Sequence, residues 1–156
     1  MANQGIRGYY QITNTIKEQL LQDQDINTVT TGDLSQVNLG KQDIFPLAHI
    51  LINNVVVGDQ TLKFNISVLA MDIVNESKNE VTDIFTGDTN EQDILNTQLG
   101  VLNKLIQVLK RGDLYTDMYQ LDGDTNLEPF YDRFENNLAG WTASLDIDIY
   151  NDITIC

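Results

Sequence analysis

Two β-rich runs, at 48–57 and 61–74, form the clearest hydrophobic pattern in the chain, and the short loop Gly58-Asp59-Gln60 joins them. Such runs around a short glycine-containing loop predict a β-hairpin. In the second run apolar and polar residues alternate up to Val68, and from Leu69 onward both faces are apolar. We therefore expect this end of the strand to be covered on both sides, by another layer or by another subunit.

Apolar residues at helical spacing predict two helices. The first covers 5–22, and the second begins after Thr89 or Asn90 and ends at Arg111. Thr89 and Gln92 have the spacing of a capping box at its start. The apolar stripe of this second helix consists of Ile94, Leu95, Leu99, Leu102, Leu105, Ile106 and Leu109.

Shorter patterns predict four further strands, at 26–31, 114–121, 127–134 and 141–150. Pro129 places the third of them at a sheet edge, because proline cannot donate a ladder hydrogen bond. The last strand alternates cleanly, with Asp146 and Asp148 on its polar face. Three segments without a clear period are expected to connect the elements: 33–46, 75–88 and 135–140. The pattern predicts an α+β fold in which a mostly antiparallel sheet of about five or six strands packs against two helices, as a single domain over 1–156.

The chain is strongly acidic, with 23 acidic and 9 basic side chains among 156 residues and a net charge of −14. The excess is concentrated after residue 112, where ten acids stand against the single base Arg133. Apart from the pair Lys110-Arg111 there is no cluster of basic residues to displace counterions, so tight binding to a phosphate backbone is disfavoured and we expect no sequence-specific binding to nucleic acid. Two interpretations of the acidity stay open: general solubility, or a surface that faces polyanions without binding them.

The remaining global features narrow the class of protein. No apolar run is long enough for a membrane span, and the first residues lack the apolar run of a signal peptide, so we expect a soluble protein that folds in a cytoplasm. Cys156 is the only cysteine, which excludes an intrachain disulfide. No phosphate-binding loop, nucleophile elbow or zinc pattern occurs, so we expect neither enzymatic activity nor a cofactor or metal.

Two candidate sites are better explained structurally. His49 is the only histidine and lies in a β-rich run, where we interpret it as a hydrogen-bonded structural residue. The segment 122–126 resembles the start of an EF-hand loop, but Leu127 stands where that loop needs a glycine and Arg133 where it needs a glutamate. A polar turn is the better interpretation of this segment.

Asp146 and Asp148 lie on one face of the last predicted strand, roughly 7 Å apart by the rise of two residues. Such a pair can act as acid and base or bind a cation. The alternation of the strand instead favours a solvated face, whose like charges also discourage unwanted pairing of strand edges.

Three stretches carry a resemblance to a known family. They are Ile6-Arg7-Gly8-Tyr9-Tyr10 followed by Val29-Thr30-Thr31-Gly32-Asp33, then Ile44-Phe45-Pro46-Leu47-Ala48-His49, and finally Phe134-Glu135-Asn136-Asn137-Leu138-Ala139-Gly140-Trp141. Their order resembles the neck and tail-completion proteins of tailed bacteriophages, most closely the tail-terminator type. The resemblance spans nearly the whole chain, on short motifs.

The resemblance implies a non-catalytic protomer that closes into a ring, commonly a hexamer, on the tail tube and beside connector proteins of the virion. DNA would pass through this ring, and Asp146 and Asp148 are candidates for acidic residues that face the channel. Two other readings compete with this one. The alternative that stays open is a soluble acidic binding module of the inhibitor or DNA-mimic type. A metal-dependent enzyme built on Asp122, Asp124, Asp146 and Asp148 is disfavoured, because the chain offers no set of histidine or cysteine partners.

Overall fold

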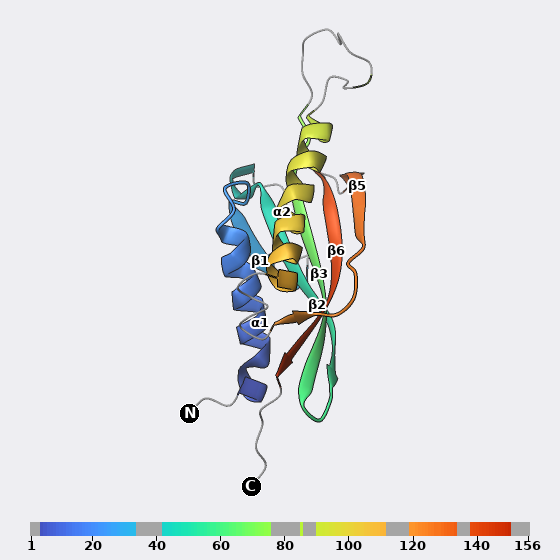
Figure 1. Cartoon of the computed structure of the whole chain (residues 1–156). Coiled ribbons are helices and arrows are strands. Elements are labelled where there is room, and N and C mark those ends of the chain that lie inside the picture. Colours follow the sequence, from blue (N-terminus) through green and yellow to red (C-terminus); the bar gives the residue numbers. More distant parts are fainter. Residues whose placement is uncertain are drawn as a thin grey trace.

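The computed structural model describes residues 4–33, 42–75, 85, 90–111, 119–133 and 138–150. Two α-helices in this part of the chain cover one face of a six-stranded sheet (Figure 1). The elements, in chain order, are α1 (Gln4–Leu21), β1 (Thr28–Thr31), the 3-10 helix η2 (Gln42–Ile44), β2 (Leu47–Val57), β3 (Thr61–Ile73), α2 (Glu91–Arg111), β4 (Gln120–Leu121), β5 (Leu127–Arg133) and β6 (Leu138–Tyr150). The predicted α+β fold is confirmed.

The sheet has the strand order β1-β2-β3-β6-β4, and β5 pairs with β6 as well. Only β1 and β2 are parallel, and the other pairs are antiparallel. On one side β6 pairs with β3 along its whole length, from Leu138 to Tyr150. On its other side β5 covers the first part of β6 and β4 covers Ile147 and Asp148. The edge position that Pro129 predicts for β5 is therefore confirmed.

The main core lies between the sheet and the two helices. Alternate residues of β3 and β6 point into it, and α1 and α2 close it with one apolar stripe each. Its fully buried large members include Ile12, Ile16, Leu20, Ile66, Leu102, Leu105, Leu109 and Leu145. The predicted alternation of the last strand is confirmed, because Ala143, Leu145 and Ile147 are completely buried on the helix side.

A second apolar cluster lies on the opposite face of the sheet, at the end formed by the start of β2 and the end of β3. It consists of Phe45, Leu47, Leu69, Met71, Phe130 and Leu138. The chain itself therefore covers the second apolar face predicted from Leu69 onward, with Phe45 following η2 and Phe130 coming from β5. The pattern left open whether another layer of the chain or another subunit covers this face. The cluster shows that the chain supplies at least a layer of its own.

The prediction that residues 135–140 connect two elements without belonging to a strand is partly wrong. Leu138, Ala139 and Gly140 already belong to β6 and pair with Ile73, Asp72 and Met71 of β3. A glycine usually signals a turn, but here Gly140 lets two strands approach closely. A Cβ on this residue would overlap the carbonyl oxygen of Ala70 and lie 2.8 Å from Cα of Met71.

Helix α2 differs from its predicted stripe and cap. Leu99 is 37% exposed, whereas Gln98 is only 1% exposed. Asn90 directly precedes the helix, and its side chain bonds to the end of β3: its Oδ1 accepts the N–H of Asn75 at 2.7 Å and its Nδ2 donates to the carbonyl of Ile73 at 3.3 Å. These bonds tie the start of α2 to the end of β3. Thr89 of the expected capping box lies outside the described residues.

The other boundaries agree less closely. β1 begins at Thr28 rather than at 26, and the strand predicted over 114–121 is described only as Gln120–Leu121. Most of the expected surface loop at 75–88 lies outside the described residues. None of the described helices is both long and apolar enough to cross a membrane.

Candidate functional site: the polar face of the sheet

The sheet surface that faces away from the helices has a polar part beside the second apolar cluster. We define this polar face by the side chains of Asn53, Lys63, Asn65, Ser67, Asp122, Asp146 and Asp148. Strands β2, β3 and β6 supply all of them except Asp122, which follows β4. The alternation that buries Leu62, Phe64 and Ile66 in the core leaves the residues between them on this face.

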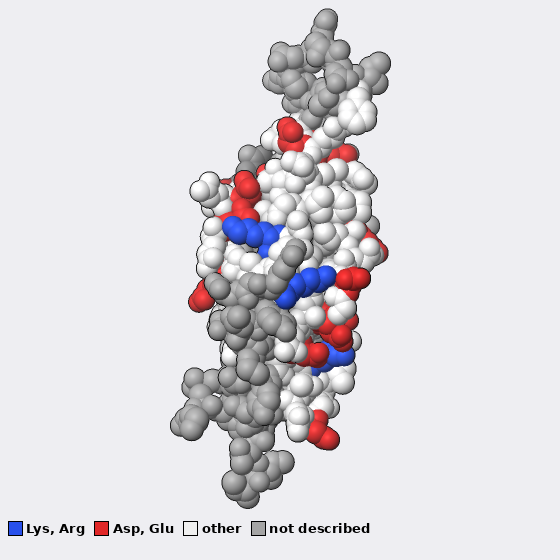
Figure 2. Space-filling view, viewed as in Figure 1, with Lys and Arg blue, Asp and Glu red and all other residues white. Residues whose placement is uncertain are grey.

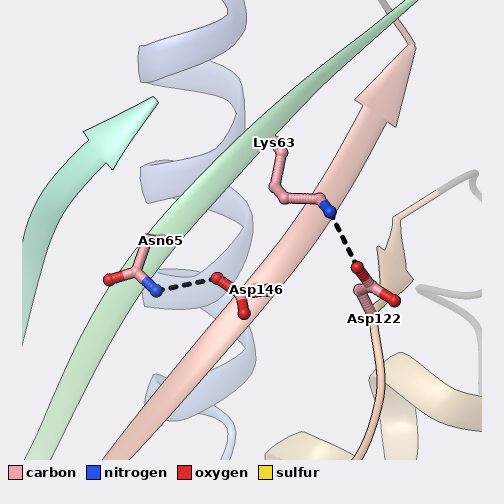
Figure 3. A network of polar contacts seen from close by, with 4 residues as sticks. All are labelled: Lys63, Asn65, Asp122 and Asp146. Carbon is pink, nitrogen blue, oxygen red and sulfur yellow. Dashed lines mark hydrogen bonds and ion pairs between the residues drawn. The ribbon is translucent and has the colours of Figure 1, made fainter. Parts of the chain in front are cut away.

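A chain of hydrogen bonds crosses three strands of the polar face. Asn65 donates from Nδ2 to Oδ1 of Asp146 at 2.7 Å (Figure 3). Because a carboxylate only accepts, this bond fixes which way the Asn65 amide points. Its Oδ1 then accepts from Nδ2 of Asn53 at 2.9 Å, and Asn53 also donates to Oγ of Ser67 at 2.8 Å. Asp146 is thus held in one orientation by a network anchored in β2 and β3.

Lys63 provides the positive charge of this face. Its Nζ lies 2.8 Å from Oδ2 of Asp122 (Figure 3). The hydrogen bond and the charge of Asp122, together with the charges of Asp148 and Asp146, raise the pKa of Lys63 above its ordinary value. Lys63 is directly opposite Asp148 in the β3–β6 register. One lysine therefore stands among three carboxylates, and the polar face keeps a net negative charge.

Asp148 has a different environment from Asp146. Burial raises the pKa of its carboxyl above the ordinary value, and the charges of Asp122 and Asp146 raise it further, while Lys63 opposes the shift. Its Oδ1 is buried and accepts no hydrogen bond in the described part of the chain. Asp148 therefore gives up its proton less readily than an exposed aspartate.

Only three of the four aspartates considered for a metal-dependent enzyme lie together in the structure. Asp122, Asp146 and Asp148 gather on the polar face, but the carboxylate of Asp124 lies 3.3 Å from Nζ of Lys110 instead. Within the described ranges, no group of three or more His, Cys, Asp and Glu side chains lies close enough to hold a metal ion. Cys156 lies outside the described residues.

Sequence reasoning missed Asn53, Asn65 and Lys63 as neighbours of the two aspartates. Their position on the outward face of the hairpin is visible as alternation in the sequence. Which of them is opposite Asp146 or Asp148 depends on the register between β3 and β6, two strands about eighty residues apart.

His49 lies away from this network and is completely buried. Its Nε2 is 2.7 Å from the carbonyl oxygen of Gly32, which can only accept, so Nε2 carries the proton. Nδ1 then accepts from the hydroxyl of Thr30 at 2.6 Å. Burial lowers the pKa of His49, against the opposing effects of the Gly32 hydrogen bond and the charge of Asp33. The interpretation of His49 as a hydrogen-bonded structural residue is confirmed.

The surface charge has no strong positive feature on the side of the molecule shown in Figure 2. Acidic side chains are spread over its length, and the basic ones are separated from one another. Among the described residues, two lysines are paired with carboxylates, Lys63 with Asp122 and Lys110 with Asp124. The described residues on this side therefore form no basic patch of the kind that phosphate backbones require.

A comparison with protein-family models finds no family that matches this chain, and a comparison with curated proteins finds no relative.

Proposed function

We propose that this chain is a non-catalytic structural protein of the tail-terminator type, which closes into a ring in the virion of a tailed bacteriophage. The observation that carries the proposal is the polar face, where Asp122, Asp146 and Asp148 gather around the single cation Lys63. In such a ring this face would line the channel. Carboxylates there repel phosphates, so DNA can move past without adhering.

Two further features support this proposal. The hydrogen bonds from Asn65 and Asn53 hold the side chains in place, as a wall of fixed shape requires. The order of short motifs along the chain resembles the tail-terminator family. Ring closure would place many copies of the polar face around one axis, and the negative potential of the channel would grow with the number of copies.

The first experiment measures mass in solution by light scattering, with negative-stain imaging, over a concentration series at low and high salt. Copies with a charge of −14 repel one another, and about 0.1 M salt screens this repulsion beyond about 10 Å. We expect rings to appear as salt and concentration rise. A chain that stays monomeric throughout, and also in the presence of tail tubes, contradicts the proposal. Capture of a basic protein by such a monomer would favour the acidic binding module instead.

The second experiment tests the channel. In assembled rings the double variant Asp146→Lys and Asp148→Lys should bind duplex DNA, measured by fluorescence anisotropy, whereas wild-type rings should not. Asp25→Lys with Asp93→Lys is the matched control, because it changes the net charge equally at two exposed positions away from the polar face. Equal DNA binding by both double variants would show that the polar face does not line the channel.

A further inference from the structure

Among the described strands, the outer edge of β2 is paired only in its first half. β1 pairs with β2 only from Leu47 to Ile50, and no described strand pairs with this edge beyond that point. The β2–β3 hairpin projects past the end of α2, so neither face of its tip is covered by that helix (Figure 1). The backbone of residues 54–57 thus presents a strand edge of the kind that accepts another strand.

Three consecutive valines make this edge apolar. Val55, Val56 and Val57 are 39%, 58% and 73% exposed. The pairing with β3 places Val56 on the side of Lys63, and its two neighbours on the side of the core residues Phe64 and Leu62. Valine favours strands, and apolar side chains on both faces can pack against an added strand.

The chain protects another sheet edge but not this one. β5 carries Pro129 and an irregular register between Phe130 and Arg133, and both features disfavour the addition of a strand. By contrast, the whole run 44–58 contains no Asp, Glu, Lys or Arg, although the chain has 32 such residues. No charge on β2 therefore blocks pairing, as charges commonly do on exposed edges.

We propose that residues 54–57 of β2 form the contact at which a second copy of this chain adds a strand to the sheet. This deepens the proposed ring, and it rests on that function only in taking another copy as the partner. For two chains that each carry −14, an uncharged edge is where close approach costs least electrostatic repulsion. Four paired residues are few beside the roughly 20–30 residues per side of a stable interface, so one contact is weak and ring closure strengthens it.

The test places one lysine on the edge. Val56→Lys should raise the protein concentration needed for half-maximal assembly at least tenfold, measured by light scattering at high salt. Leu99→Lys is the matched control, since it puts the same charge on an exposed apolar residue of α2, and it should stay within twofold of wild type. Both positions are exposed, and circular dichroism with thermal melting verifies that both variants fold.

Amide hydrogen exchange locates the contact independently. On raising the concentration through the assembly range, the amides of residues 54–57 should gain protection in wild type and not in Val56→Lys. A wild-type assembly that ends at a dimer but shows this protection supports the edge contact and overturns the ring. Rings that form equally well in Val56→Lys, without protection at 54–57, overturn the edge contact and leave the ring standing. A wild-type chain that never associates overturns both.

Discussion

His49 and Gln98 are both buried polar side chains, but they differ in how far hydrogen bonds within the protein replace those to water. His49 makes a hydrogen bond at each ring nitrogen, to Gly32 and Thr30, in a completely buried position. Gln98 is almost as deeply buried on α2, yet its Oε1 has no hydrogen-bond partner in the described part of the chain. A buried acceptor without a partner costs about 1–3 kcal/mol, whereas a bonded one contributes a modest net stabilisation.

His49 should make stability depend on pH just below neutrality. Its folded pKa lies below the ordinary 6.5, so the unfolded chain takes up the proton first as the pH falls. The contribution to stability is therefore complete above about pH 6.5 and is lost below it, with a slope of at most about 1.4 kcal/mol per pH unit. Denaturant unfolding between pH 7.5 and 5.5 should show this slope in wild type and a flatter profile in His49→Gln. Since His49 is the only histidine, parallel profiles would refute the assignment.

Replacing Gln98 with leucine should stabilise the protein. The change removes the unpaired Oε1 and puts an apolar side chain between Ile94 and Leu102, which are both buried. We expect a gain of about 1–2 kcal/mol in the free energy of unfolding. Asn96→Leu, at an exposed position of the same helix, should change it by no more than about 0.5 kcal/mol. A loss of stability in Gln98→Leu would mean that the amide has a role that the packing does not show.

At the scale of elements, close backbone contact decides where the sheet is most sensitive. Gly140 lies in β6 between β3 and β5, opposite Met71 on one side and Phe130 on the other. The main chain of Ala70 and Met71 occupies the space that a Cβ would need. Gly100 of α2 is the opposite case, because nothing lies within 4 Å of the position of a Cβ there.

The two glycines therefore predict opposite effects of the same substitution. Gly140→Ala should destabilise the protein by about 1–3 kcal/mol or more, because two central strands must separate. Gly100→Ala should stabilise it by about 0.8–1 kcal/mol, the difference in helix propensity between the two residues. Urea unfolding of both variants checks the pair. A tolerated alanine at 140 would show that the β3–β6 spacing is wider than described.

For the whole molecule the dominant physical quantity is its charge. A net charge of −14 opposes compaction of one chain and association of several. Among the described residues only short-range pairs such as Lys63 with Asp122 offset it locally. Salt should therefore act on folding and on assembly in the same direction.

Stability should rise with ionic strength. Between about 10 mM and 200 mM sodium chloride the melting temperature should increase, because screening weakens repulsion among the carboxylates more than it weakens the few ion pairs. Dilute protein, below the assembly range, keeps this effect separate from association. Substituting Lys63→Gln should steepen the salt dependence, since it leaves Asp122, Asp146 and Asp148 without their common cation. A falling melting temperature would show that ion pairs outweigh the overall repulsion.

The sequence by itself determined the helices, the hairpin, the edge position of β5 and the polar side of β6. These follow from side-chain periods of 3.6 and 2, which depend only on local backbone geometry. It did not determine that Gly140 belongs to a strand, that Gln98 is buried, or that Phe45 and Phe130 cover the second apolar face.

Only the tertiary structure decided which polar residues meet. Asn65 bonds to Asp146 and Lys63 is opposite Asp148 because β3 and β6 pair in one particular register. Lys63 also bonds to Asp122, because β4 pairs with β6 beside Asp148. No described strand pairs with the outer edge of β2 beyond Ile50, and this is likewise a consequence of the short β1. Both facts depend on contacts between segments distant in sequence. A period of two residues determines which face of a strand is buried, but it does not distinguish registers that differ by two residues, and it does not show where a neighbouring strand ends.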